Sequence, residues 1–313
     1  MSETSQASFM GTAELAVGRE KRNGHLSMVL FAALISASFS LGSLAAPHIS
    51  SSALNTARFL VALMVMGAVT LAIYRRLPVP HAAPWRFGVL GALMAAYFIA
   101  MFVALKITDP VSTGAVFTLI PLMSAGFGYL FLRQTVRPVV IFSLIIAGLG
   151  SVWVIFRGDL QALLSLDVGL GEMIFFCGCV CHAAYAPLVK KFNRREPVIQ
   201  TTYWTTMATF ACVLLVGIGT GDIVYTDWVS LPGIVWVVVL YLGVVTSAGT
   251  FFLVQYASMR LPASKVLSYG YMIPVFIILY EGLLGHGWAS FSVLAGAVLT
   301  VMGLVVMARA PDL

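Results

Sequence analysis

One short run of the sequence brings together side chains that could bind a metal ion. It reads Cys177-Gly-Cys-Val-Cys181-His182, and on a helix Cys177 and Cys181 share a face while Cys179 points away. Thiolates and an imidazole suit a transition metal, but zinc sites normally draw their ligands from turns, and this run offers no second ligand pair. We therefore expect no metal site and no cofactor. The cysteines, including Cys212, are interpreted as small buried apolar residues, and His182 as a polar group in a cavity or between helices.

A scattered set of polar side chains could bind a zwitterionic solute. An amino acid needs partners for its ammonium and carboxylate groups, and an apolar or aromatic wall for its side chain. Candidates near the middle of apolar runs are Tyr97, His182, Tyr185, Gln255, Tyr269, Tyr271, Ser38 and Ser40, with Tyr241 as a further tyrosine. Tyrosines near helix ends also form the interfacial belt of membrane proteins, so this alternative stays open for them.

Charged residues and prolines also interrupt the apolar runs. Arg58 and Glu172 lie near helix ends, where snorkelling or pairing at the interface is the simplest interpretation. Pro121 and Pro274 fall inside expected helices, and each frees a backbone carbonyl one turn earlier. Such breaks are tolerated mainly beside protein or a watery cavity. We assign Pro121, Pro274 and Glu281 to gating or a hinge, with a bend for packing as the alternative.

The elements that must position these residues are membrane helices. The 313-residue chain is 60% hydrophobic and only 10% charged, with a mean hydropathy of +0.97, whereas soluble domains carry roughly a quarter charged residues. Apolar runs of about twenty residues match one crossing of the bilayer. We predict an all-α integral membrane protein with ten transmembrane helices, near 26–46, 53–74, 86–105, 111–132, 138–156, 169–189, 199–219, 232–257, 263–284 and 288–308.

The basic residues indicate how these helices are oriented. The net charge of +6 comes from short clusters between apolar runs, which marks topology and argues against nucleic-acid binding. Most of the 18 basic residues, Arg86 and Lys265 among them, fall in alternate loops on one side, which predicts that both termini are cytoplasmic. Residues 1–25 are polar and are expected to form a flexible cytosolic tail rather than a signal peptide.

An internal repeat points to two halves of opposite orientation. Pro121 precedes Gly150 by 29 positions, and Pro274 precedes Gly303 by the same 29. Five helices per half is an odd number, so the halves must be inverted around a central cavity, as in many transporters. Small residues at every fourth position predict close helix contacts along two stripes, Ala92, Ala96, Ala100 and Ala104 in one and Ser143, Ala147 and Ser151 in the other.

These features together resemble the tandem EamA-type members of the drug/metabolite transporter superfamily. The Arg58-Phe59 pair opens the second helix, Ala104-Leu105 closes the third, and the repeated Pro/Gly pattern completes the likeness. The similarity implies a first five-helix repeat over 26–156, a linker over 157–168, a second repeat over 169–308 and a cytosolic end at 309–313. The sequence looks most like the bacterial amino-acid exporters of the YddG type. In this family the third and ninth helices line the cavity, which favours Tyr97, Tyr269 and Tyr271 as binding residues.

The resemblance implies export of aromatic and other neutral amino acids by alternating access in the bacterial inner membrane, by a protein that works as a monomer. Efflux of other small metabolites or drugs is the alternative. Proton-coupled efflux of cationic drugs is disfavoured, because it needs a carboxylate in the middle of the membrane and the first predicted helix has none. An intramembrane enzyme is disfavoured, because a nucleophile, a base and an orienting group would have to converge, and His182 is the one plausible base.

Overall fold

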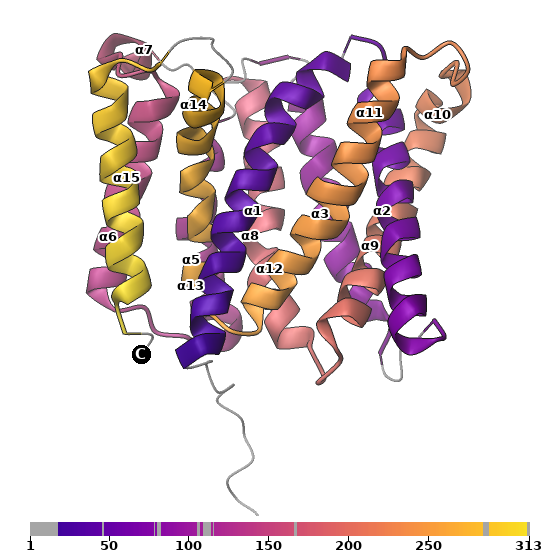
Figure 1. The fold of residues 1–313 in the computed structure, drawn as a ribbon, viewed down its shortest axis with the longest axis horizontal. Coiled ribbons are helices and arrows are strands. Elements are labelled where there is room, and N and C mark those ends of the chain that lie inside the picture. Colours follow the sequence, from indigo (N-terminus) through magenta and orange to yellow (C-terminus); the bar gives the residue numbers. More distant parts are fainter. Residues whose placement is uncertain are drawn as a thin grey trace, which may run out of the picture.

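A computed structural model describes residues 18–45, 47–77, 79, 83–104, 107–108, 114, 116–165, 168–283 and 288–311, except for the side chains of 39, 40, 42, 43 and 281. Regular structure in this part of the chain is entirely helical (Figure 1). The first five described helices are α1 (Gly18–Ala45), α2 (Ser51–Tyr74), α3 (Trp85–Ala104), α5 (Ile120–Leu132) and α6 (Pro138–Ile155).

The second half begins with the short α7 (Leu160–Leu164) and contains two helices that change type along their length. It continues with α8 (Leu170–Phe192), α9 (Val198–Gly219), the short α10 (Asp222–Tyr225), α11 (Gly233–Tyr241), the π-helix η1 (Leu242–Gly249), α12 (Thr250–Ser258), α13 (Ala263–Val266), the 3₁₀-helix η2 (Leu267–Met272), α14 (Ile273–Leu283) and α15 (Phe291–Arg309). The helices run roughly parallel to one another in a single bundle (Figure 1).

Local chemistry sets many of the helix ends. The hydroxyls of Ser50 and Ser290 accept hydrogen bonds from the first turns of α2 and α15. Pro138 stands at the start of α6, where its missing N–H costs nothing. Arg75 and Arg133 end α2 and α5 in the left-handed conformation. Helix boundaries therefore follow capping residues as well as hydropathy.

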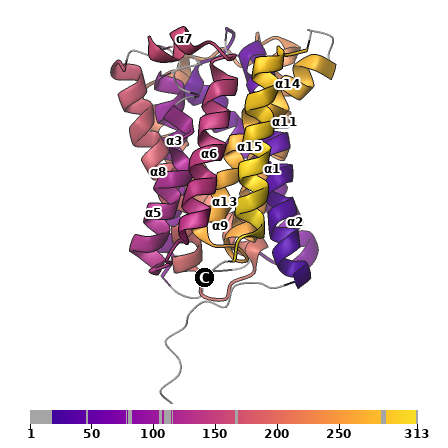
Figure 2. The ribbon, with the colours of Figure 1, turned by 90° about the vertical axis from the view of Figure 1, so that its left-hand side faces the viewer.

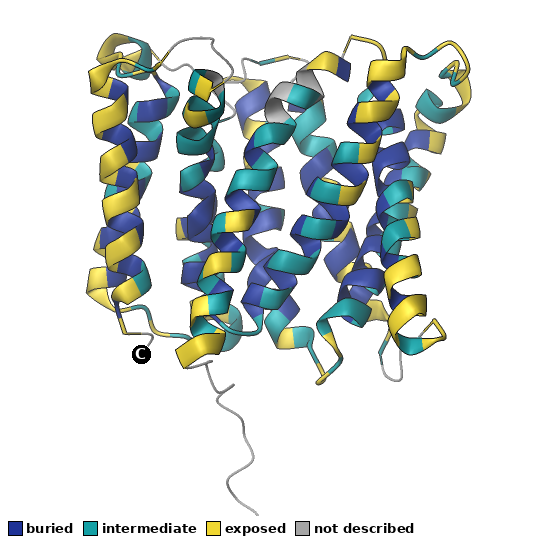
Figure 3. Ribbon diagram, viewed as in Figure 1, coloured by how far each residue is buried: buried dark blue, intermediate teal, exposed yellow. Residues whose placement is uncertain are grey.

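Eight helices in the described part of the chain are long and apolar enough to cross a membrane. They include the continuous stretches Gly233–Ser258 and Ala263–Tyr280. Exposed residues lie mainly on the outer faces and at the ends of the bundle, and buried residues lie mainly on the faces that the helices turn toward one another (Figure 3). Phe142, Leu149 and Met302 are large, apolar and exposed on α6 and α15, as expected for residues that face lipid. The chain is thus a multi-pass membrane protein.

The first helix is longer than the sequence predicts. Instead of starting near residue 26, α1 begins at Gly18, so residues 18–25 are helical rather than part of a flexible tail. The beginning of α1 and the C-terminus lie at the same end of the bundle, which we call the terminal end; α7 and α10 lie at the opposite end, which we call the loop end (Figure 1).

Small residues bring α6 and α15 together, as predicted for the stripe Ser143, Ala147 and Ser151. A Cβ at Gly150 would come within 2.7 Å of the Gly296 carbonyl oxygen, and one at Gly303 within 2.8 Å of the Ser143 carbonyl oxygen. The two helices lie side by side in the turned view (Figure 2). The alanine stripe on α3 behaves differently, since Ala92 and Ala96 are exposed. The expected contact occurs nearer the C-terminal end of α3, where Ala100 packs against Gly178 of α8.

The two helices that contain Pro121 and Pro274 are interrupted just before these prolines. A turn at Thr118 and Leu119 precedes α5, in which Pro121 is the second residue. The 3₁₀-helix η2 precedes α14, in which Pro274 is again the second residue. Each proline therefore begins a new α-helix, where its missing N–H costs no hydrogen bond.

Candidate functional site

A cluster of polar and aromatic side chains is buried where α2, α3, α8, η1 and α12 meet. We call it the interior cluster and define it by Arg58, Phe98, Tyr97, His182, Tyr185, Phe59, Phe251, Ser247 and Gln255, all of which are buried. Contacts between α3 and α8 and between α2 and η1 bring these elements together. Four of its members were predicted from the sequence as binding residues, namely Tyr97, His182, Tyr185 and Gln255, and the Arg58-Phe59 pair was singled out as well; the structure places all six in one connected set of contacts.

His182 stacks on Tyr97 in the first part of the interior cluster. The ring centroids lie 4.5 Å apart, with 28° between the planes. Gly178 makes this approach possible, because a Cβ there would lie 2.8 Å from Ala100 and 3.4 Å from the Tyr97 Cα. Phe175 and Phe117 contribute further ring contacts at 6.0 and 6.3 Å. The His182 Nδ1 atom is buried and has no hydrogen-bond partner among the described residues.

Tyr185 and Gln255 form the second part of the cluster. The Gln255 amide nitrogen donates to the Tyr185 hydroxyl at 3.1 Å. The side-chain carbonyl oxygen of Gln255, Oε1, is buried and has no hydrogen-bond donor among the described residues. Phe251 packs 6.0 Å from the Tyr185 ring and 5.7 Å from the Phe59 ring. Buried polar atoms almost always find a partner, so an acceptor left open here marks a place where a ligand or water can bind.

Arg58 occupies the third part, and its position corrects the expectation of a snorkelling side chain. The residue is only 4% exposed. Its Nε donates to the Ser247 hydroxyl at 3.0 Å, and its guanidinium lies 4.5 Å from the Phe98 centroid and 5.2 Å from the Phe59 centroid. No carboxylate of the described residues pairs with it. The sequence did carry a signal for this role, because an ionisable residue within an apolar membrane helix is a functional candidate by default.

The π-helix η1 positions Ser247 for this contact. A Cβ on Gly243 would lie 2.6 Å from the Val61 side chain and 2.8 Å from the Arg58 carbonyl oxygen, so only glycine lets η1 pack this closely on α2. Such π-helical insertions are rare and occur often at functional sites. The hydropathy of 232–257 gave no sign of the π-helix.

The other predicted binding residues lie apart from the interior cluster. The Tyr269 hydroxyl forms a hydrogen bond of 2.8 Å with Nδ1 of His25, a residue of α1. The Tyr271 hydroxyl points at Gly148 of α6, where a Cβ would be 3.1 Å away, and has no hydrogen-bond partner in the described chain. The Ser38 hydroxyl donates to the Ile35 carbonyl within α1. The Tyr241 hydroxyl likewise donates to a backbone carbonyl of α1, that of Leu34. The side chains of Ser40 and Glu281 lie outside the described residues.

At the terminal end, α5 and α13 are held together by close contacts. The Ala263 N–H donates to the Gln134 side-chain oxygen at 3.1 Å, and the Ser124 hydroxyl donates to the Ala263 carbonyl at 3.4 Å. A Cβ on Gly128 would lie 2.9 Å from the Ala263 side chain. The two proline-containing segments therefore meet at this end of the bundle.

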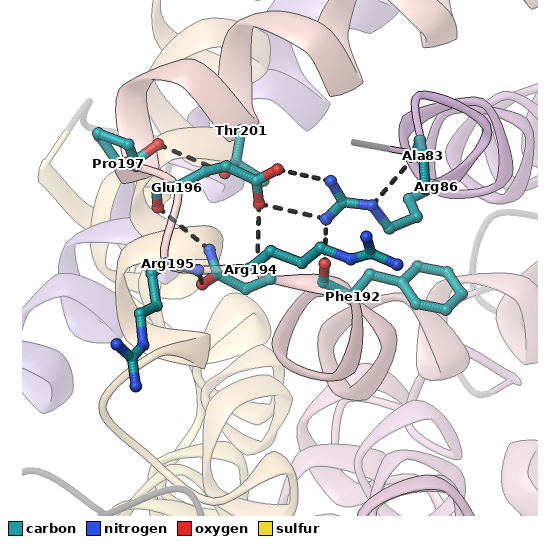
Figure 4. Close-up of polar contacts among 9 residues, drawn as sticks. Ala83, Arg86, Phe192, Arg194, Arg195, Glu196, Pro197 and Thr201 are labelled. Atoms are coloured by element: carbon teal, nitrogen blue, oxygen red, sulfur yellow. Dashed lines mark hydrogen bonds and ion pairs between the residues drawn. The ribbon is translucent and has the colours of Figure 1, made fainter. Parts of the chain in front are cut away.

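Two basic residues counted as topology charges are buried instead. Lys265 is 1% exposed and donates from Nζ to the Ala310 carbonyl at 2.6 Å. Arg86 is also buried and forms an ion pair with Glu196, from the loop between α8 and α9, at 2.5 Å (Figure 4). The Arg86 guanidinium also donates to the carbonyls of Ala83 and Phe192. Both side chains satisfy backbone carbonyls, which fixes loops at the terminal end.

Glu196 is the central hydrogen-bond acceptor around this ion pair. It receives hydrogen bonds from two Arg86 nitrogens at 2.5 and 3.2 Å and from the Arg194 amide at 2.9 Å. Partial burial raises the pKa of Glu196, but the hydrogen bonds from Arg86 and from the Arg194 amide outweigh burial and hold the pKa below its ordinary value. The arrangement joins the starts of α3 and α9 to the end of α8, a structural role.

The remaining acidic and sulfur-containing candidates are also structural. The Glu172 carboxylate accepts a hydrogen bond from the Thr108 hydroxyl and another, at 2.9 Å, from the Gly169 amide, so it caps α8. All four cysteines are free thiols; Cys179 is buried, but Cys181 and Cys212 are half-buried and Cys177 is exposed, contrary to the expectation that all are buried. Among the described residues, no three histidine, cysteine or acidic side chains gather around one point.

Comparison with known proteins identifies the family. The model of the EamA-like transporter family matches the chain twice, over residues 22–156 and 169–309. The chain belongs to this family. The family name and that of a relative point to a transporter rather than an enzyme: a protein of Bacillus subtilis (strain 168) called uncharacterized transporter YyaM is 26% identical over 218 residues, 69% of this chain and 70% of its own. A solved crystal structure of a protein shares the fold, with a TM-score of 0.75, 21% identity and coverage of 93% of this chain and 99% of that one.

Proposed function

We propose that this EamA-family transporter exports aromatic and other neutral amino acids across the bacterial inner membrane. The observation that carries the proposal is the interior cluster. Its rings offer an apolar wall for a side chain, and the open acceptors on His182 and Gln255 suit an ammonium group. Amino-acid export also agrees with the resemblance of the sequence to the YddG-type exporters.

Transport would proceed by alternating access of two inverted five-helix repeats, 26–156 and 169–308. The two matches to the family model support two repeats, and α1 and α5 would add two crossings to the eight long apolar helices. In this arrangement the termini are cytoplasmic and the terminal end faces the cytosol. The protein would act as a monomer, since the interior cluster is built within one chain.

The interrupted helices are the natural places for motion. Pro121 and Pro274 each follow a break, and in a packed bundle a break concentrates bending at a few residues. We assign both prolines, with Glu281 on α14, to a hinge or gate. The contacts of Gln134 and Ser124 with Ala263 would then close the cytoplasmic side.

Counterflow in proteoliposomes tests the substrate class. Purified protein would be reconstituted with internal phenylalanine, and uptake of labelled phenylalanine, tryptophan, threonine and a cationic dye would be followed. We expect saturable uptake of the amino acids and none of the dye. Absence of saturable flux for every amino acid would refute the proposal and favour efflux of another metabolite, which the family membership supports equally.

A further inference from the structure

We propose that Arg58 binds the carboxylate of the transported solute, so that the site accepts small apolar or aromatic carboxylates and rejects amines and other cations. This inference rests on the proposed function, because it names the group that selects the substrate in the interior cluster. It starts from an anomaly of charge: a buried guanidinium without an acidic partner among the described residues.

A buried cation of this kind is costly to maintain. Taking a charge out of water is unfavourable unless hydrogen bonds or an opposite charge replace the lost hydration. Arg58 has one hydrogen bond in the described chain, from Nε to Ser247, and contacts with two aromatic faces. Cation–π contacts recover only part of that cost. No described residue supplies the compensating anion, and the transported solute is the molecule that would bring one to this place.

The surroundings hold the guanidinium in a fixed orientation. Phe98 and Phe59 lie against it, and their own rings are 5.2 Å apart in an edge-on contact. Ser247 occupies the Nε position. The two terminal nitrogens make no hydrogen bond to a described residue. A planar guanidinium whose terminal nitrogens lack a described protein acceptor matches a carboxylate, which it would bind through two parallel hydrogen bonds.

The same chain of ring contacts leads from Arg58 to the open acceptors. Phe98 is 5.0 Å from Tyr97, which stacks on His182, while Phe59 leads through Phe251 to Tyr185 and its partner Gln255. A carboxylate at Arg58 would thus have aromatic walls beside it and neutral acceptors beyond. Neutral acceptors accommodate an ammonium group but do not require one. The positive charge of Arg58, in contrast, repels a solute that carries only a cation.

The first experiment compares matched ligands on the wild-type protein. Counterflow of labelled phenylalanine would be competed with phenylalanine, phenylpropionate, phenylalanine amide and phenethylamine. We expect the two carboxylates to compete and the amide and amine to be weaker by at least about tenfold, the usual loss of a charge-assisted pair of hydrogen bonds. Equal competition by the acid and the amine would overturn the inference without touching the proposed function.

Variants then assign the discrimination to Arg58. Arg58→Gln should abolish the preference for carboxylates, and Arg58→Lys, which keeps the charge but not the fork, should retain only part of it. Ser247→Ala serves as the control that removes the positioning contact and keeps the guanidinium; the preference for carboxylates should persist with an increased KM. An unchanged acid-to-amine ratio in Arg58→Gln, with a normal size-exclusion profile, would show that Arg58 is only structural.

Direct binding separates failure of the inference from failure of the proposed function. If the wild type moves no amino acid, the proposed function is wrong, and thermal stabilisation of purified protein by phenylpropionate and by phenethylamine tests Arg58 alone. Stabilisation by the acid only, lost in Arg58→Gln, would support carboxylate binding; stabilisation by neither ligand, or by both, would refute it. If Arg58→Gln does not fold, the comparison of ligands on the wild type decides.

Discussion

Replacing Glu196 with glutamine should destabilise the protein at the terminal end of the bundle. The side chain of Arg86 is 2% exposed and that of Glu196 is 19% exposed, and they meet at 2.5 Å. Removing one partner of a buried ion pair costs about 3–5 kcal/mol, because the other charge is left without compensation. Because Glu196 is partly exposed and glutamine keeps one accepting oxygen, we expect a loss of about 2–3 kcal/mol.

Thermal unfolding in detergent measures this loss, with a second ion pair of the same protein as the control. For a chain of 313 residues, a loss of 2–3 kcal/mol corresponds to a melting temperature lower by roughly 3–5 °C. Glu20 also pairs with an arginine, Arg260, at 2.7 Å, but 55% of its side chain is exposed. Glu20→Gln should therefore change the unfolding free energy by less than about 0.5 kcal/mol. If Glu196→Gln and Glu20→Gln have the same melting temperature, the buried ion pair does not stabilise the fold.

The pH dependence provides an independent check. The pKa of Glu196 lies below its ordinary value of 4.5 in the folded protein. The ion pair therefore stabilises fully above the unfolded-state pKa, and this stabilisation is lost as the pH falls through the lower folded-state pKa. The difference in melting temperature between wild type and Glu196→Gln should be constant near neutral pH and narrow below about pH 4. A difference that stays constant down to pH 3 would contradict the assigned charge state.

Three further substitutions, with Gly126→Ala as a control for the first, test packing and the interior cluster. Gly150→Ala should cost about 1–3 kcal/mol in thermal unfolding, because its Cβ would meet the backbone of α15, whereas Gly126→Ala, with open space around it, should be neutral or stabilising. Gly243→Ala should displace η1 from α2, and we therefore expect it to raise the KM for transport and to lower the melting temperature. A normal KM would refute the role of this close approach. Gln255→Leu should raise the KM for amino acids but not for phenylpropionate, and equal effects on both would argue against an ammonium site there.

The positions of the helices could be predicted from the sequence, because hydropathy and length are direct consequences of crossing a bilayer. Most expected boundaries, such as 53–74 for α2 and 199–219 for α9, differ from the observed ones by only a few residues. The start of α1 was missed, since residues 18–25 are polar and a helix there needs no hydropathy signal. Hydropathy also could not reveal η1 and η2, which depend on packing between helices.

The directions of the side chains could not be predicted in the same way. In a soluble protein the polar face of a helix indicates which side is outside, but lipid and the protein interior are both apolar. Arg58, Arg86 and Lys265 were therefore assigned to the interface or to loops, although all three are buried. Tyr97 and His182 were expected in a common site and do lie together, whereas Tyr269 and Tyr271 contact α1 and α6.

The interlocked glycines of α6 and α15 have a mechanical consequence. Backbone atoms of the partner helix lie within about 3 Å of a Cβ at Gly150, Gly296 and Gly303, so sliding one helix along the other would push main-chain atoms into each other. We expect the pair to move as one lever, with bending confined to the breaks before α5 and α14. Spin labels placed across the pair would then keep one distance throughout the transport cycle, while labels spanning either break would report two. The pair thus supplies a fixed frame against which the motion of the other helices can be measured.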